Sequence, residues 1–167
     1  MSGRNKKGRD VNGVVLLDKS VGNTSNHSLQ RAKRLFEAKK AGHTGSLDPL
    51  ASGLLPICFG QATKVAQYLL DGDKRYFVVA KLGQISSTGD IEGDVESFGS
   101  TNNIDKASIR AILTQFVGEI NQIPPMYSAL KHNGTPLYKL ARKGIEVKRD
   151  SRAVTIHKIN ILNYTEE

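Results

Sequence analysis

The segment from Ala41 to Gly53 constrains the fold more than any other part of this chain. It contains three glycines and one proline, so a regular helix cannot run through it. Its single carboxylate, Asp48, directly precedes Pro49, and a following proline favours an extended backbone. The segment therefore predicts a shaped polar loop that carries one acid. On the residues alone, the simplest interpretation is a turn in which the Asp48 side chain caps a backbone N–H.

The size and composition of the chain exclude several classes of protein. Its 167 residues suffice for one domain with a hydrophobic core. We find no segment apolar and long enough to span a membrane, and no signal-peptide pattern at the N-terminus. A single cysteine, Cys58, excludes an internal disulfide and a cysteine-based zinc site. We therefore expect a cytoplasmic protein that binds neither a membrane nor a metal.

The charge balance points to a polyanionic partner. The 24 lysines and arginines exceed the 16 acids and give a net charge of +8, which is typical of proteins that meet nucleic acid. Residues 1–10 carry four of these cations among glycines and predict a flexible basic arm. Arg31 and Arg34 fall on the polar face of a predicted helix, where a phosphate-contacting stripe and an ordinary solvated surface are equally good interpretations.

Periodicity predicts both helices and strands. Helices are expected from an N-cap within residues 23–25 to about residue 38, and at 62–70, 105–116 and 136–144. Strands are expected at 14–17 (buried on both faces), 75–82, 119–123 and 154–161, the last with a bulge near residue 157. Residues 84–103 are polar and predict a long loop. Because these elements alternate without a regular βαβ order, we predict an α+β fold with a mixed, largely antiparallel sheet flanked by helices.

Few reaction types fit the side chains that remain. The chain lacks a phosphate-binding glycine loop, a dinucleotide-binding motif, a nucleophile elbow and histidines at metal-ligand spacing. An EF-hand starting at Asp90 is excluded because Thr101 stands where the closing glutamate is needed. Asp48 could act as a general base, a metal ligand or a nucleophile. The nucleophile role needs least, namely one rigidly held carboxylate with cations nearby.

The segment Gly42-His43-Thr44-Gly45-Ser46-Leu47-Asp48-Pro49-Leu50-Ala51-Ser52-Gly53-Leu54-Leu55-Pro56 strongly resembles the signature of the TruB-type tRNA pseudouridine synthases. The resemblance is collinear from about residue 10 to the C-terminus. Four further segments carry it, in the family's order: residues 12–19, 60–64, 73–76 and 122–131.

The resemblance implies a reaction without a cofactor, in which a uridine in the T-loop of tRNA becomes pseudouridine at conventional position 55. Asp48 would be the nucleophile that attacks the flipped-out nucleotide. Tyr76 would stack on the base, and His43 would fill the space that the base leaves. Lys19 and Lys64 would line the site. The implied partner is the T-arm of tRNA, and we expect a monomer.

Alternatives stay open for these residues and for the chain. Without the resemblance, Tyr76 reads as a core residue of its strand and His43 as a hydrogen-bonding loop residue. Family members continue into a segment like Lys-Gly-Thr-Tyr-Ile-Arg, whose arginine pairs with the aspartate, and then into a small RNA-binding domain. We therefore expect residues 11–167 to be the N-terminal part of the catalytic domain. A tRNA-binding or RNA-chaperone module without catalysis, and a hydrolase of glycosidic bonds, remain alternatives.

Overall fold

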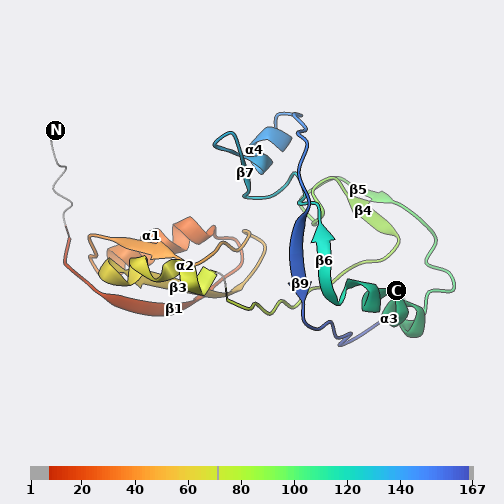
Figure 1. The fold of residues 1–167 in the computed structure, drawn as a ribbon, viewed down its shortest axis with the longest axis horizontal. Helices are drawn as coiled ribbons and strands as arrows, with labels where there is room; N and C mark the ends of the chain where they lie inside the picture. Colours follow the sequence, from red (N-terminus) through yellow and green to blue (C-terminus); the bar gives the residue numbers. More distant parts are fainter. Residues whose placement is uncertain (1–7, 71, 166–167) are drawn as a thin grey trace. The chain divides into compact units, whose positions relative to one another are not determined.

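The computed structural model describes residues 8–70 and 72–165, so most of the predicted basic arm lies outside the described residues (Figure 1). The chain forms two compact units. The N-terminal unit ends at Phe77 and the C-terminal unit begins at Val78. Every pair of named strands runs antiparallel, and helices accompany them in both units. The predicted α+β class with antiparallel pairing is confirmed, although the strands form four small sheets rather than one.

The N-terminal unit is built on a three-stranded sheet in the order β1-β3-β2. The strands are β1 (Gly13–Lys19), β2 (Ala41–His43) and β3 (Gly53–Phe59). The predicted strand at 14–17 is confirmed within β1, but its burial on both faces was wrong. Val15 and Leu17 pack on the core, whereas Leu16 is 70% exposed. Successive side chains of a strand point to opposite faces, and only one face of β1 is covered by the core.

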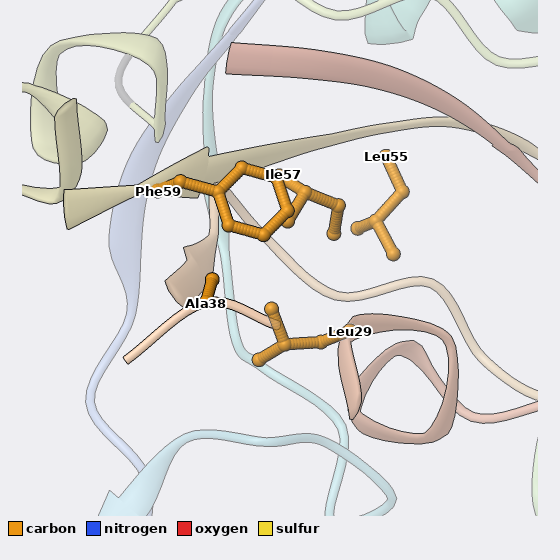
Figure 2. Packing of buried hydrophobic residues seen from close by; sticks show 5 residues of the cluster. All are labelled: Leu29, Ala38, Leu55, Ile57 and Phe59. Atoms are coloured by element: carbon orange, nitrogen blue, oxygen red, sulfur yellow. The ribbon is translucent and has the colours of Figure 1, made fainter. Parts of the chain in front are cut away.

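Helix α1 (Ser25–Leu35) supplies the other wall of this core. Its N-cap is Thr24, whose hydroxyl accepts a hydrogen bond from the backbone amide of His27 at 3.1 Å, as the cap prediction allowed. Figure 2 shows the five buried residues of the cluster, which come from α1, from the segment after it and from β3: Leu29, Ala38, Leu55, Ile57 and Phe59.

The helix ends earlier than its apolar pattern indicated. It stops at Leu35, because Glu37 adopts a positive φ of 50° and turns the chain toward Ala38. Leu35 is 80% exposed and lies outside the core. The ring of Phe36 still reaches the core, with its centroid 5.1 Å from that of Phe59.

The continuous helix predicted at 62–70 was also wrong. A 3-10 turn, η1 (Gly60–Lys64), is followed by a separate one-turn helix, α2 (Ala66–Leu70). Val65 breaks the two apart with φ −98° and ψ 0°, and its amide bonds the carbonyl of Ala62 at 3.2 Å. Val65 and Leu69 are about half exposed. A helix this short depends on burial of its apolar face, and here that face is only partly covered.

The strand predicted at 75–82 is absent. Residues 73–81 form no regular secondary structure. Val78 and Val79 are at least 75% exposed, so the apolar run is not covered. A strand is stable only when a neighbouring strand satisfies its backbone groups, and no described strand pairs with this one.

The C-terminal unit contains three two-stranded sheets. They pair β4 (Gln84–Ser86) with β5 (Val95–Ser97), β6 (Gly118–Gln122) with β9 (Arg152–Ile156), and β7 (Lys131–His132) with β8 (Thr135–Pro136). The strand expected at 119–123 is confirmed as β6. The loop expected at 84–103 contains a hairpin. The last strand ends at Ile156 without a bulge, because β6 offers no partner beyond Gly118.

Two helices lie in the same unit. Helix α3 (Lys106–Leu113) begins at Asp105, whose carboxylate accepts the amide of Ser108 at 2.7 Å in a capping box, and the 3-10 turn η2 (Thr114–Phe116) follows it. Phe116, the last residue of η2, is 47% exposed and lies outside the core. Helix α4 (Leu137–Ala141) begins one residue later than expected, because Pro136 occupies the N-cap and also pairs in β8.

Candidate active site

The loop that carries Asp48 leaves the sheet after β2 and returns to it at the start of β3. The loop rejoins the sheet at Gly53, which pairs with Lys19. The loop and the C-terminal end of β1 therefore lie at the same end of the sheet. Gly45 has φ +113°, a conformation that L side chains rarely adopt, and the predicted need for glycine is confirmed there. The backbone carbonyl of Asp48 accepts the amide of Ala51 at 3.0 Å and closes a turn.

The Asp48 carboxylate itself is exposed. Within residues 8–70 and 72–165, no hydrogen bond or ion pair engages it. The turn-capping interpretation of the Asp48 side chain is therefore wrong. The hydrogen bond that closes the turn is accepted by the backbone carbonyl of Asp48. A carboxylate in this state can approach a substrate without first breaking an internal bond.

The backbone around Asp48 is tied to the segment that precedes α1 and to the first residue of that helix. The hydroxyl of Ser25 accepts a hydrogen bond from the Leu47 amide at 2.8 Å and donates one to the Leu47 carbonyl at 3.0 Å. The amide of Gly22 donates to the Pro49 carbonyl at 2.8 Å. These contacts join parts of the chain that are more than twenty residues apart, and our sequence reasoning missed them, since it considered Ser25 only as a local cap.

Lys19, the last residue of β1, is buried, with only 1% of its surface exposed. Its ammonium group donates to the carbonyls of Ser20 at 3.0 Å and Asn23 at 2.7 Å. The side-chain amide of Asn23 also donates to the Ser20 hydroxyl at 3.1 Å. The cation therefore holds the loop that carries Gly22, and through the Gly22–Pro49 bond it supports the Asp48 turn.

His43 is the last residue of β2, where it pairs with Ile57 of β3. Its side chain is half-buried, and its Nδ1 atom is buried without a hydrogen-bond partner among the described residues. The alternative of a hydrogen-bonding loop residue does not fit this position. A buried ring nitrogen without a partner costs free energy, and such an atom can be satisfied by a ligand.

Lys64 lies elsewhere in the unit, at the end of η1. It lines a cavity of about 240 Å³ together with Arg9, Lys39 and Lys40. One acid, Asp10, also lines the cavity and pairs with Lys39 at 3.0 Å. Positive charge therefore exceeds negative charge around it, and a phosphate group is the chemistry that such a lining fits. Of these cavity residues, the family resemblance had indicated only Lys64.

The cavity and the Asp48 loop belong to opposite ends of the central strand. Gly60, which lines the cavity, follows Phe59 at one end of β3, and Gly53 begins the other. Seven extended residues separate these ends by about 20 Å. The structure thus places Lys19 at the end of the sheet that bears the Asp48 loop. His43 pairs with Ile57 in the interior of β3, and the Lys64 cavity lies at the other end of that strand.

Tyr76 lies in the irregular segment at the end of the N-terminal unit, and its side chain is 68% exposed. No ring contact or hydrogen bond of Tyr76 occurs in the part of the chain that the structure describes. The alternative of a core residue is wrong at this exposure. Arg31 and Arg34 are exposed on α1, a position that fits both interpretations of that stripe.

Other chemistry is limited in the described residues. In residues 8–70 and 72–165, no three histidines, cysteines or acids gather as a metal site would require. Over the same residues, no helix has the length and apolarity needed to cross a bilayer. Burial raises the pKa of the Cys58 thiol, so this cysteine stays protonated at neutral pH and behaves as a core residue.

Known proteins with similar sequences identify the family. The family model described as TruB family pseudouridylate synthase (N terminal domain) matches residues 33–167. The chain belongs to this family. Among its relatives, the tRNA pseudouridine synthase B of Actinobacillus pleuropneumoniae is 57% identical over 98% of the chain and 53% of that protein. That of Nitrosococcus oceani is 54% identical over 95% of the chain and 51% of that protein.

The TruB resemblance inferred from the Asp48 segment is thereby confirmed. The chain spans about half the length of the curated relatives it matches. A solved Cbf5-Nop10-Gar1 complex contains a chain that matches 97% of this one and is itself covered to 43%, with a TM-score of 0.56 and 23% identity. At that identity the match supports a shared fold and nothing finer.

Proposed function

We propose that this chain forms the N-terminal half of an enzyme that converts uridine to pseudouridine in the T-loop of tRNA. The observation that carries the proposal is the state of Asp48 in a TruB-family chain. Its carboxylate is exposed and unpaired among the described residues, while the backbone on both sides of it is fixed by hydrogen bonds. A nucleophile needs this combination of an available oxygen and a rigid support.

In the proposed reaction, Asp48 attacks the flipped-out nucleotide and the bond between the sugar C1′ and the uracil N1 breaks. The uracil turns, C5 bonds to C1′, and the bond to Asp48 breaks and returns the free carboxylate. The hydrogen on C5 is lost as a proton while N1 gains one. The atoms balance without a cofactor. Flipping the base out of a folded loop costs a few kcal/mol, which contacts in the site must offset.

The other site residues take supporting roles in this proposal. The Tyr76 ring stacks on the flipped base, and its side chain is exposed and therefore accessible to a ligand. His43 occupies the space that the base vacates. Lys19 stabilises the loop that is bonded to Pro49 beside Asp48. Lys64, in the cationic cavity, contacts the tRNA backbone. We propose a monomer that acts on tRNA in the cytoplasm.

A specific observation favours a second candidate, an RNA-binding module without chemistry. The cavity lined by Arg9, Lys39, Lys40 and Lys64 would bind RNA phosphates whether or not Asp48 reacts. The two functions differ in their product, because binding alone leaves the uridine unchanged.

The deciding experiment uses the full-length protein and a tRNA transcript labelled with tritium at uracil C5. Isomerisation releases one tritium per modified uridine into water and leaves the RNA mass otherwise unchanged. We expect release by the wild type and a loss of at least about 10³-fold in Asp48→Ala. Asp150→Asn, another exposed acid, is the matched control and should retain the wild-type rate.

Three results would contradict the proposal. Tritium release at the normal rate by Asp48→Ala would remove the nucleophile assignment. Tight tRNA binding by the wild type without release would favour the binding module. Free uracil in the supernatant would indicate hydrolysis of the glycosidic bond instead.

A further inference from the structure

Asp48 lies between two residues whose backbones are both fixed by the segment around the start of α1. Before it, Leu47 exchanges hydrogen bonds of 2.8 and 3.0 Å with the hydroxyl of Ser25. After it, the Pro49 carbonyl accepts the Gly22 amide at 2.8 Å. The first contact uses a side chain and the second uses only backbone. A substitution can therefore remove the first contact without altering the second.

The Ser25 hydroxyl suits this contact for a simple reason. A hydroxyl has one donor and two acceptor lone pairs, so it can satisfy the amide and the carbonyl of the same residue at once. Ser25 is only 4% exposed, which limits the access of water as a replacement partner. The bonded residues are 22 apart in sequence, so this is a tertiary contact and not a local cap.

We infer that Ser25 is a positioning residue for Asp48, and that its hydroxyl sets where the carboxylate meets the nucleotide. The inference rests on the proposed function, since the placement of Asp48 affects turnover only if Asp48 reacts. A displacement of about 1 Å at a reacting group can cost about 10²-fold in rate. Ser25 is buried and does not offer a surface to RNA, so binding of tRNA does not depend on its hydroxyl.

The test compares three variants of the full-length protein. Ser25→Ala removes both hydrogen bonds, Ser25→Thr keeps the hydroxyl, and Ser28→Ala removes a half-buried hydroxyl one turn along the same helix. We expect the kcat of Ser25→Ala to fall about 10- to 100-fold with the Kd for tRNA within about twofold of wild type. Ser25→Thr should recover most of the rate, and Ser28→Ala should match the wild type. A general structural weakness would instead affect both alanine variants or change tRNA affinity.

A second measurement does not need activity and separates this inference from the proposed function. Hydrogen exchange at the Leu47 amide reports whether the bond to Ser25 exists. It should speed up at least about tenfold in Ser25→Ala and stay unchanged in Ser28→Ala. If the wild type forms no pseudouridine, the proposed function fails and the positioning role fails with it, although faster exchange would still verify the contact.

Two outcomes would overturn the inference while leaving the proposed function intact. The first is wild-type turnover in Ser25→Ala. The second is slow turnover in Ser25→Thr while its Leu47 amide remains protected, because the hydroxyl contact would then be present without its expected effect.

Discussion

The ammonium group of Lys19 donates a 2.7 Å hydrogen bond to the backbone carbonyl of Asn23. Lys19, at the end of β1, thereby stabilises the loop between β1 and α1 from inside the protein. Gly22 of this loop in turn donates a hydrogen bond to the carbonyl of Pro49. Among the described residues, this buried cation donates to the carbonyls of Ser20 and Asn23. The relationship gives Lys19 a structural role that a resemblance to a family cannot reveal.

Lys19→Met should destabilise the N-terminal unit by about 1–3 kcal/mol. Methionine has a similar length but leaves the carbonyls of Ser20 and Asn23 without their charged donor. Urea unfolding measures the change, with Lys106→Met on exposed α3 as the control that should stay within about 0.5 kcal/mol of wild type. Unchanged stability with weakened tRNA binding would instead assign the Lys19 cation to RNA.

Leu29→Ala should cost about 2–5 kcal/mol in the free energy of unfolding of the same unit. Leu29 is 8% exposed and packs in the cluster with Leu55, Ile57 and Phe59, so truncation leaves a cavity. Leu35→Ala on the same helix provides a matched comparison, because Leu35 is 80% exposed and should change stability by less than about 0.5 kcal/mol. Equal effects from the two alanines would show that the core is placed wrongly.

The cationic cavity predicts a measurable salt dependence. Lys40→Gln and Lys64→Gln should each reduce the slope of log K for tRNA against log salt by about one, because each removes one phosphate contact. The measurement is a binding titration between about 50 and 200 mM salt with the full-length protein. Lys106→Gln, an exposed lysine outside the cavity, should leave the slope unchanged. An unaltered slope in both cavity variants would exclude the cavity as a phosphate site.

The cap of α3 should lose its charged contribution in acid. The backbone amide and then the side chain of Ser108 lower the pKa of Asp105 by hydrogen bonding its carboxylate. A carboxylate whose folded-state pKa lies below its unfolded value, about 3.9, contributes stability above that value and loses it as the pH falls through the folded-state pKa. At pH 6, the Cα chemical shifts of α3 should therefore report a larger helical population in the wild type than in Asp105→Asn. The difference should vanish once the carboxylate is protonated, and a difference that persists in acid would contradict the charge effect.

Local sequence was sufficient where the determining contacts lie within a few residues. Thr24 and Asp105 cap the helices that their sequence positions predicted, because an N-cap bonds an amide two or three residues away. The Asp48 loop forms as expected, since its proline and glycines restrict the backbone wherever they occur, although the strands β2 and β3 on either side of it were not predicted. The family also followed from the residues, because the segment around Asp48 resembles the family whose model matches the chain.

Packing and pairing decided what the sequence could not. The apolar spacing at 62–70 indicated one helix, but a tighter turn and a break at Val65 replaced it. The apolar run at 75–82 had no strand to pair with. The Ser25–Leu47 contact joins residues 22 apart, so only the folded chain could reveal it. The sequence by itself determined the proposed nucleophile, Asp48, and the loop that bears it, because both were inferred from local residues. Only the tertiary structure decided how that loop is held, because its supports are hydrogen bonds between distant segments.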